Sequence, residues 1–380
     1  MRIMADWIRA EDVQAVLGVL ARGGHRALMV GGCVRNVLLG QPVADVDIAT
    51  DATPERVVRL AEAGGLKVVP TGIDHGTVTV ISGGVPHEVT TFRRDVETDG
   101  RRAVVAYSDR IEDDAARRDF TMNALYAEAD GTVVDPLGGL PDLVARRVRF
   151  VGDPHERIAE DYLRILRFFR FHAWYGDPAQ GLDPEGLAAC AAGVDGMARL
   201  SRERIGHEMR RLLAAPDPAP ALAAMQAAGV LAAVLPGADA RAIAPLVHLE
   251  GCAAPRWLRR LAALGGEDAA DRLRLSRVEA RGLESRHAAL GEGASLAAVA
   301  WRAGGEVAED VALVRAALGG QPLPCGWQAE IAHGSAAHFP VRARDLMPAL
   351  SGAALGARMK ELEERWLASG LRLSREQLLA

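Results

Sequence analysis

The chain has 380 residues, of which 49% are hydrophobic and 25% charged, as is ordinary for a globular protein of more than one domain. No apolar run approaches the roughly 20 residues that span a bilayer, and the first residues are too highly charged for a signal peptide, so we expect a cytoplasmic protein with no membrane partner. A net charge of −5 argues against a protein that coats nucleic acid by bulk electrostatics. Four widely spaced cysteines predict neither a disulfide framework nor a zinc site.

Short β-rich runs alternate with short helical patterns up to about residue 150, which predicts an α/β head. From residue 153 onward, stretches rich in Ala, Leu and Arg have helical spacing and are broken by Pro and Gly. We therefore expect a head at 1–150, a helical neck at 151–215, and a helical body and tail at 216–380. The expected strands are 27–30, 46–48, 66–69, 76–81, 87–92, 125–129 and 132–134.

The first candidate for chemistry is a strand that runs into the Gly31-Gly32 turn and a short helix. Glycines at such a turn let backbone N–H groups approach phosphate oxygens closely, and Arg35 lies one turn into the helix. Asp45 and Asp47 are separated by one residue, so on a strand both carboxylates project from the same face. Such a pair suits two Mg²⁺ ions that bridge an attacking hydroxyl and a nucleoside triphosphate. A plain turn and a solvated strand edge explain each piece alone, but not both at this spacing.

The second candidate lies within residues 113–126, where Arg118 is suited to bind a triphosphate. A helix over this segment would place Asp119 and Asn123 on one face, because they are four residues apart. A solvated, salt-bridged helix is the alternative interpretation. The apolar residues of the same segment argue against it, because they would bury part of the helix and fix the arginine.

The third candidate is the segment 160–171, in which charged residues recur at every third position with apolar residues between them. Unpaired buried charge is very costly, so the guanidinium groups of this segment must face a cleft, a carboxylate or a bound anion. The alternative is a surface ion pair between the first two charged residues, which would contribute little. The recurring residues are Asp161, Arg164, Arg167 and Arg170.

Together, these segments resemble the motifs of the class II (bacterial-type) tRNA nucleotidyltransferase and poly(A) polymerase family. The family patterns GGxVRD…DxD, RRDFTxNA and EDxxRxxRxxR are similar to residues 31–47, 117–124 and 160–170, in that order. Between the last two, DPxGGxxDLxxxxxR is similar to residues 135–147. One departure is Asn36, which stands where the family usually has Asp.

The resemblance implies a polymerase-β-like α/β head with a small mixed sheet, followed by an all-α region. It also implies a template-independent enzyme that adds C, C and A from CTP and ATP to the 3′ end of tRNA. Asp45 and Asp47 would bind catalytic Mg²⁺, and Glu88 is our candidate for a third catalytic carboxylate. The implied nucleotide-binding residues are Gly32, Arg35, Arg118, Asn123, Asp161, Arg164, Arg167 and Arg170.

Asp161 and Arg164 would act as an amino-acid template for the incoming base. The carboxylate accepts from the exocyclic amine of cytosine or adenine, and the guanidinium donates to the adjacent ring acceptor. Uracil and guanine present the opposite pattern and leave buried partners unpaired. The stretch 93–105 resembles a flexible loop of the CCA-adding members, which could move when specificity changes from C to A.

In the C-terminal half, residues 201–213 resemble the family's neck helix, and residues 339–366 are similar to its RNA-holding tail. Arg342, Arg344, Arg358 and Lys360 are candidates for phosphate contacts, although ordinary solvated helices explain them nearly as well. Three other functions stay open: poly(A) addition, partial C or A addition, and a non-catalytic RNA-binding scaffold. The template pair and the loop favour complete CCA addition, and the paired aspartates argue against a scaffold. The sequence carries no signal for a particular oligomeric state.

Overall fold

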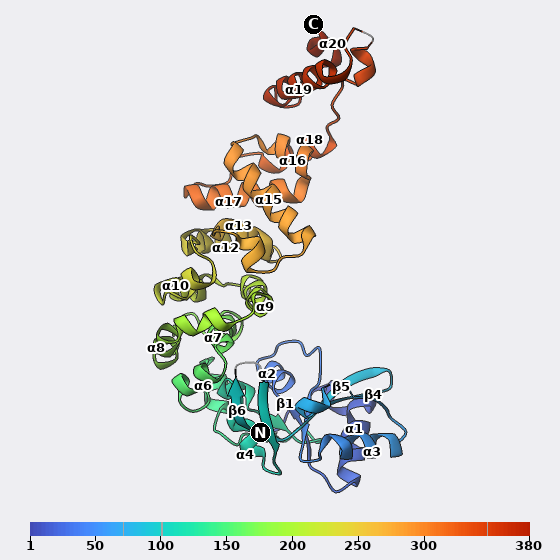
Figure 1. Ribbon diagram of the computed structural model, residues 1–380, viewed down its shortest axis with the longest axis vertical. Coiled ribbons are helices and arrows are strands. Elements are labelled where there is room, and N and C mark those ends of the chain that lie inside the picture. Colours follow the sequence, from blue (N-terminus) through green and yellow to red (C-terminus); the bar gives the residue numbers. More distant parts are fainter. Residues whose placement is uncertain (71, 100–101, 348) are drawn as a thin grey trace. The chain divides into compact units, whose positions relative to one another are not determined.

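The computed structural model describes residues 1–70, 72–99, 102–347 and 349–380 (Figure 1). The chain divides into an N-terminal unit, residues 1–201 and 227–233, and a helical unit, residues 202–226 and 234–380. In the described part of the chain, no helix is long and apolar enough to cross a membrane. The three-part division expected at residues 150 and 215 stays a prediction.

A seven-stranded mixed sheet with the strand order β3-β4-β5-β2-β1-β8-β9 forms the core of the N-terminal unit. Its strands β2 and β5 run parallel, and the other neighbours are antiparallel. The expected small mixed sheet is therefore confirmed, and each expected strand overlaps an observed one. The strands are β1 (Ala27–Val30), β2 (Ile48–Thr50), β3 (Lys67–Val69), β4 (Thr77–Ser82), β5 (Val85–Thr91), β8 (Tyr126–Ala127) and β9 (Val133–Val134).

Strands β6 (Arg93–Asp99) and β7 (Arg102–Tyr107) pair as a separate antiparallel hairpin after β5 (Figure 1). This hairpin covers the described part of the stretch 93–105 that resembles the family's flexible loop, and residues 100 and 101 lie outside the described residues. Charged residues alternate with Val and Thr from residue 95 to residue 99, which is compatible with a strand.

Helices and short 3₁₀ turns surround the sheet and continue from it. Helix α1 buries its apolar residues at a helical spacing, with Val13, Leu17 and Leu20 almost inaccessible to solvent. The elements up to residue 201 are η1 (Asp6–Arg9), α1 (Glu11–Arg22), α2 (Gly32–Leu38), α3 (Pro54–Ala63), η2 (Ile73–His75), α4 (Ile111–Ala116), η3 (Thr121–Asn123), α5 (Leu140–Val144), α6 (Pro154–Glu160), α7 (Leu163–Tyr175), α8 (Pro184–Ala192) and η4 (Val194–Arg199).

Beyond residue 150, the described part of the chain contains helices but no strand, as the sequence predicts. The further elements are α9 (Arg202–Leu213), α10 (Ala219–Ala227), α11 (Val230–Val234), η5 (Ala240–Ala242), α12 (Ile243–Glu250), α13 (Trp257–Leu264), α14 (Ala269–Arg272), α15 (Arg277–Glu292), α16 (Leu296–Ala303), α17 (Gly305–Gly319), α18 (Trp327–Ala336), η6 (Ala343–Asp345), α19 (Gly352–Ala368) and α20 (Arg375–Leu379).

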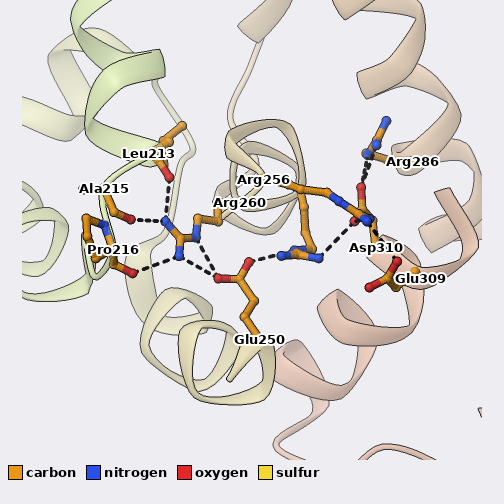
Figure 2. Close-up of polar contacts among 10 residues, drawn as sticks. Leu213, Ala215, Pro216, Glu250, Arg256, Arg260, Arg286, Glu309 and Asp310 are labelled. Atoms are coloured by element: carbon orange, nitrogen blue, oxygen red, sulfur yellow. Dashed lines mark hydrogen bonds and ion pairs between the residues drawn. The ribbon is translucent and has the colours of Figure 1, made fainter. Parts of the chain in front are cut away.

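Arg259 and Arg260 of α13 are buried in the helical unit, and Figure 2 shows Arg260 with its partners. Arg259 and Arg260 are 0% and 1% exposed, and both donate to the carboxylate of Glu250 at the end of α12, at 2.7 Å and 2.6 Å. Arg260 also donates to three backbone carbonyls between α9 and α10, those of Leu213, Ala215 and Pro216. These bonds satisfy charges that would otherwise strongly destabilise the core.

Asp310 of α17 is the second buried carboxylate of this cluster (Figure 2). Its Oδ1 accepts from Arg256 at 2.9 Å and from Arg259 at 3.3 Å, and its Oδ2 accepts from Arg286 at 2.8 Å and 2.6 Å. Glu250 and Asp310 therefore join α12, α13, α15 and α17 through charge-assisted hydrogen bonds, which fix how these helices pack.

Replacing Asp310 tests how much this cluster of arginines and carboxylates contributes to the stability of the helical unit. Asp310→Asn leaves three arginines without their shared carboxylate, and we expect the free energy of unfolding to fall by about 3–5 kcal/mol. Urea denaturation of the full chain measures the change. The control Asp239→Asn removes an exposed pair with Arg241 and should leave the unfolding midpoint unchanged. An unchanged midpoint for Asp310→Asn would show that the cluster does not hold the helices together.

A third buried carboxylate, Asp114 of α4, is 0% exposed and lies in the N-terminal unit. It accepts hydrogen bonds from Arg117 at 2.6 Å, from Arg118 at 2.8 Å and from the Tyr126 hydroxyl at 2.7 Å. Burial alone would raise the pKa of Asp114, but the two arginines and the hydroxyl hold this pKa at about 2. The carboxylate therefore stabilises the fold fully above its unfolded pKa of about 3.9, and this contribution is lost as the pH falls through 2.

Acid unfolding should reveal this linkage. We expect Asp114→Asn to lower the free energy of unfolding at pH 7 by about 3–5 kcal/mol, because two arginines lose a buried partner. The variant should also depend less on pH than the wild type between about pH 4 and pH 2. Circular dichroism during acid titration measures both effects, with Asp109→Asn as the exposed control. Equal acid dependence of Asp114→Asn and wild type would contradict the assignment.

Candidate active site

Three carboxylates gather where β2 and β5 begin to run side by side. Because Ile48 pairs with Val89 in the parallel register, the preceding residues Asp47 and Glu88 come level with each other. Desolvation by surrounding protein raises the pKa of Asp47, repulsion from Glu88 raises it further, Arg118 partly offsets these effects, and Asp45 adds a smaller repulsion. The structure thus brings the three predicted carboxylates into one electrostatic group.

The expected position of the paired aspartates on a strand was wrong. Asp45 and Asp47 lie in an irregular segment, and β2 begins only at Ile48. The backbone carbonyl of Asp47 nevertheless accepts a hydrogen bond from Val30 N at 2.9 Å, which fixes the segment against the end of β1. The three carboxylates remain open to solvent.

Among the described residues, no three acidic, histidine or cysteine side chains form a complete metal site by themselves. Mg²⁺ usually takes one or two protein carboxylates and completes its shell with water and substrate phosphates. The like-charge repulsion at Asp47 is relieved by a bound cation. The carboxylates therefore fit a divalent cation that phosphates help to hold.

The glycine turn lies beside this group. Gly31 has a φ of 73°, which favours glycine, and its N–H donates to the carbonyl of Leu125 at 3.1 Å. A Cβ on Gly31 would come 3.4 Å from Nη1 of Arg118, so this guanidinium faces the turn. Gly32 is the first residue of α2. The turn, Arg118 and Asp47 are therefore neighbours.

A chain of hydrogen bonds connects the predicted nucleotide-binding residues of three segments. Arg35 of α2 donates to Oδ1 of Asn123 at 2.5 Å, and Nδ2 of Asn123 donates to Oδ1 of Asp119 at 2.8 Å. Arg167 of α7 donates to the other oxygen of Asp119 at 2.7 Å. Burial alone would raise the pKa of Asp119, but Arg167 and Asn123 hold this pKa at about 2, so the carboxylate is charged near neutral pH.

The expected helix through Asp119 and Asn123 was wrong, although their contact exists. Helix α4 ends at Ala116, and only the 3₁₀ turn of Thr121–Asn123 follows. Oδ1 of Asp119 accepts from the backbone N–H of Phe120 at 2.8 Å, and Phe120 is extended, with φ −125° and ψ 147°. A short acidic side chain that binds its neighbouring backbone offers the chain an alternative to the helix.

The predicted template pair lies at the start of α7, not within one helix. Asp161 has an extended backbone, and its Oδ1 accepts from Leu163 N at 3.1 Å. Arg164 pairs with Glu160 and donates to the backbone carbonyls of Arg157 at 2.8 Å and Arg117 at 3.1 Å. The two residues are adjacent in this turn, and their role in selecting the base stays a prediction.

Arg170 lies in the same cluster and is almost fully buried. Its guanidinium carbon lies 4.5 Å from the ring centroid of Phe171. The charge of Arg170 also acts on Arg35, as does that of Arg167. The structure therefore brings these three predicted arginines together.

Asn36, the departure from the family pattern, has a defined local role. Its Oδ1 accepts from Nε and Nη2 of Arg35 at 3.1 Å and 2.8 Å, and its Nδ2 donates to the carbonyl of Pro42 at 3.0 Å. The amide thus satisfies the arginine without adding a negative charge.

Three residues of the site were not identified from the sequence. Glu160 and Asp114 hold Arg164 and Arg118, and each precedes its arginine by four residues, a spacing that predicts a helical ion pair. Tyr175 accepts a hydrogen bond from Arg35 at 2.9 Å and lies four residues after Phe171, so the same spacing indicated that these two rings meet.

Known families match two parts of this chain. The Poly A polymerase head domain matches residues 27–149, which include the carboxylates and the glycine turn. The probable RNA and SrmB-binding site of polymerase A matches residues 181–241. Both matches agree with the order of a mixed-sheet head followed by helices.

Individual relatives carry the similarity further along the chain. The human mitochondrial CCA tRNA nucleotidyltransferase 1 is 39% identical over 204 residues, which are 53% of this chain and 47% of the human protein. The chain thus spans about half the length of that relative. The CCA-adding enzyme of Geobacillus thermodenitrificans is 37% identical over 330 residues, covering 81% of this chain and 79% of that protein.

A solved structure gives the same result for the fold. The Bacillus stearothermophilus CCA-adding enzyme in complex with CTP has a TM-score of 0.74 and 30% identity, covering 94% of this chain and 93% of that one. The sequence motifs, the mixed-sheet head, the helical region and these relatives agree. The chain therefore belongs to the family of CCA-adding enzymes, the tRNA nucleotidyltransferases.

Proposed function

We propose that the chain adds C, C and A from CTP and ATP to the 3′ end of tRNA and releases diphosphate. The observation that carries this proposal is the position of Arg118 between two parts of the site. Its charge acts on Asp47, and its Nη1 faces Gly31. The carboxylates, the glycine turn and the arginines therefore form one site in which a triphosphate can meet a divalent cation.

The carboxylates and arginines have separate roles in this proposal. Asp45 and Asp47 hold Mg²⁺, and Glu88 supports them as the third carboxylate. The chemistry that a bound Mg²⁺ would supply is activation of the RNA 3′ hydroxyl and neutralisation of the triphosphate. The triphosphate is held by Gly32, Arg35, Arg118, Arg167 and Arg170, and Asn123 belongs to the same nucleotide site.

Base selection falls to Asp161 and Arg164. Both terminal nitrogens of Arg164 are engaged by Glu160 and by backbone carbonyls. Its Nε has no acceptor within the described part of the chain, and so it is able to donate to a ring acceptor of cytosine or adenine. Asp161 accepts a hydrogen bond from the exocyclic amine of either base. Uracil and guanine present the opposite donor and acceptor pattern, so they can make neither hydrogen bond.

We place the tRNA along the helical region and the protein in the cytoplasm. Arg342, Arg344, Arg358 and Lys360 lie in or beside η6 and α19 and are proposed to contact RNA phosphates. The exposed free thiols of Cys252 and Cys325 suit a reducing compartment.

The nucleotide requirement separates the proposed function from its alternatives. We expect tRNA that lacks its CCA end to incorporate two C residues from CTP and then one A from ATP, with little incorporation of U or G. Labelled triphosphates supplied singly and together, with product length read on a sequencing gel, measure this. Incorporation of A alone, long A tails, or arrest after CC would instead identify a partial enzyme or a poly(A) polymerase.

Removing the aspartate pair tests catalysis directly. The double variant Asp45→Asn with Asp47→Asn should lose incorporation by at least about a thousandfold, because the cation loses both carboxylates. Thermal unfolding and tRNA binding should remain as in the wild type, since both side chains are open to solvent. The control Asp130→Asn changes an exposed turn aspartate and should retain activity. Retained activity in the double variant would disprove the metal assignment.

A further inference from the structure

One aromatic ring lies beneath three of the predicted triphosphate-binding arginines. The guanidinium carbons of Arg170, Arg35 and Arg167 lie 4.5 Å, 5.2 Å and 5.3 Å from the ring centroid of Phe171. Phe171 is buried in α7 and packs against Phe120, with ring centroids 4.9 Å apart. The ring is therefore a fixed platform, and such distances are typical of cation–π contacts.

Tyr175 extends this platform by one helical turn. Its ring centroid is 5.4 Å from that of Phe171 and 4.0 Å from the guanidinium carbon of Arg35. Its hydroxyl also accepts a hydrogen bond from Nη2 of Arg35 at 2.9 Å. Tyr175 therefore contacts Arg35 both through its ring face and through its hydroxyl oxygen. Together these two contacts fix the position and the rotation of the guanidinium.

The other partners of Arg35 are neutral as well. Nε and Nη2 donate to Asn36, and Nη1 donates to Asn123, so four of the five N–H groups of the guanidinium bind uncharged oxygens. Within the described part of the chain, no carboxylate forms an ion pair with Arg35. Burial lowers the pKa of Arg35, Tyr175 and Asp119 offset part of this effect, and Arg170 and Arg167 add to it. A bound anion would relieve this unfavourable environment.

We propose that Tyr175, supported by Phe171, is a positioning residue that aims Arg35 at the triphosphate of CTP and ATP without neutralising its charge. A carboxylate in the same place would satisfy the guanidinium equally well, but it would cancel the charge that attracts the phosphates. The aromatic face and the phenol oxygen fix the group and leave one Nη1 N–H for the ligand. This inference rests on the proposed function, because it assumes that Arg35 binds the triphosphate.

Two variants separate the hydroxyl from the ring. Tyr175→Phe removes one hydrogen bond, and we expect KM for the triphosphate to rise by about fivefold. Tyr175→Leu also removes the aromatic face, and we expect a rise of about tenfold or more. The rise should be the same for CTP, with tRNA lacking its CCA end, and for ATP, with tRNA ending in CC, because both share the triphosphate. We expect kcat to stay within about twofold.

Inorganic tripolyphosphate gives a readout that has no base. As a competitive inhibitor it carries only the phosphate chain, so its inhibition constant should rise in the Tyr175 variants by the same factor as KM. The control Trp257→Leu removes the aromatic face from Arg210, whose guanidinium carbon lies 5.5 Å from that ring, and should change neither constant. A lower melting temperature with unchanged KM and unchanged tripolyphosphate inhibition would show that Tyr175 is only structural and would overturn the inference.

Arg35→Ala distinguishes this inference from the proposed function. If Arg35→Ala raises KM and the inhibition constant while neither Tyr175 variant does, the positioning role is wrong and the triphosphate assignment stands. If Arg35→Ala itself leaves both constants unchanged, the assignment of Arg35 to the triphosphate is wrong and the positioning role falls with it. Tyr175→Phe keeps the ring that packs on Phe171, so it provides a folded variant even if Tyr175→Leu unfolds.

Discussion

The candidate site depends on the carboxylate of Asp119, which joins segments that are distant in the sequence. One oxygen accepts from Asn123, which in turn binds Arg35 of α2, and the other accepts from Arg167 of α7. Because these partners keep the pKa of Asp119 at about 2, the carboxylate holds both sides at physiological pH. The glycine turn, the segment after α4 and the arginine helix are therefore positioned by one buried anion, and the phosphate-binding geometry follows from it.

The chain contains two kinds of buried arginine, and their partners separate them. Arg259 and Arg260 pair with Glu250 in the helical unit, so their charges are compensated and their contribution is to packing. Arg35 is also buried, yet it meets amide oxygens, a phenol and aromatic faces. Neutral partners fix a guanidinium but leave its charge to act on a ligand. The difference between the two environments separates the packing role of Arg259 and Arg260 from the ligand-binding role proposed for Arg35.

The sequence predicts the mixed sheet, the helical region and the grouping of the motifs. These features depend on hydrophobic periodicity and on the order of the motifs, and both can be read directly from the sequence. It fails where a side chain competes with the backbone. Spacing alone supports a helix through Asp119 and Asn123, but Asp119 binds the N–H of Phe120 and an extended segment results. It also fails where two partners are adjacent in sequence: Arg164 pairs with Glu160, while Asp161 lies outside the helix. No period distinguishes those two carboxylates.

Asn36, where the family usually has Asp, connects the arginine proposed to bind the triphosphate with the segment proposed to bind the cation. Its carbonyl oxygen orients Arg35, while its amide N–H donates to Pro42 in the irregular segment that leads to Asp45 and Asp47. A carboxylate at this position would accept from Arg35 but would have no hydrogen to give to Pro42. The amide therefore ties the arginine proposed for the triphosphate to the segment proposed for the cation.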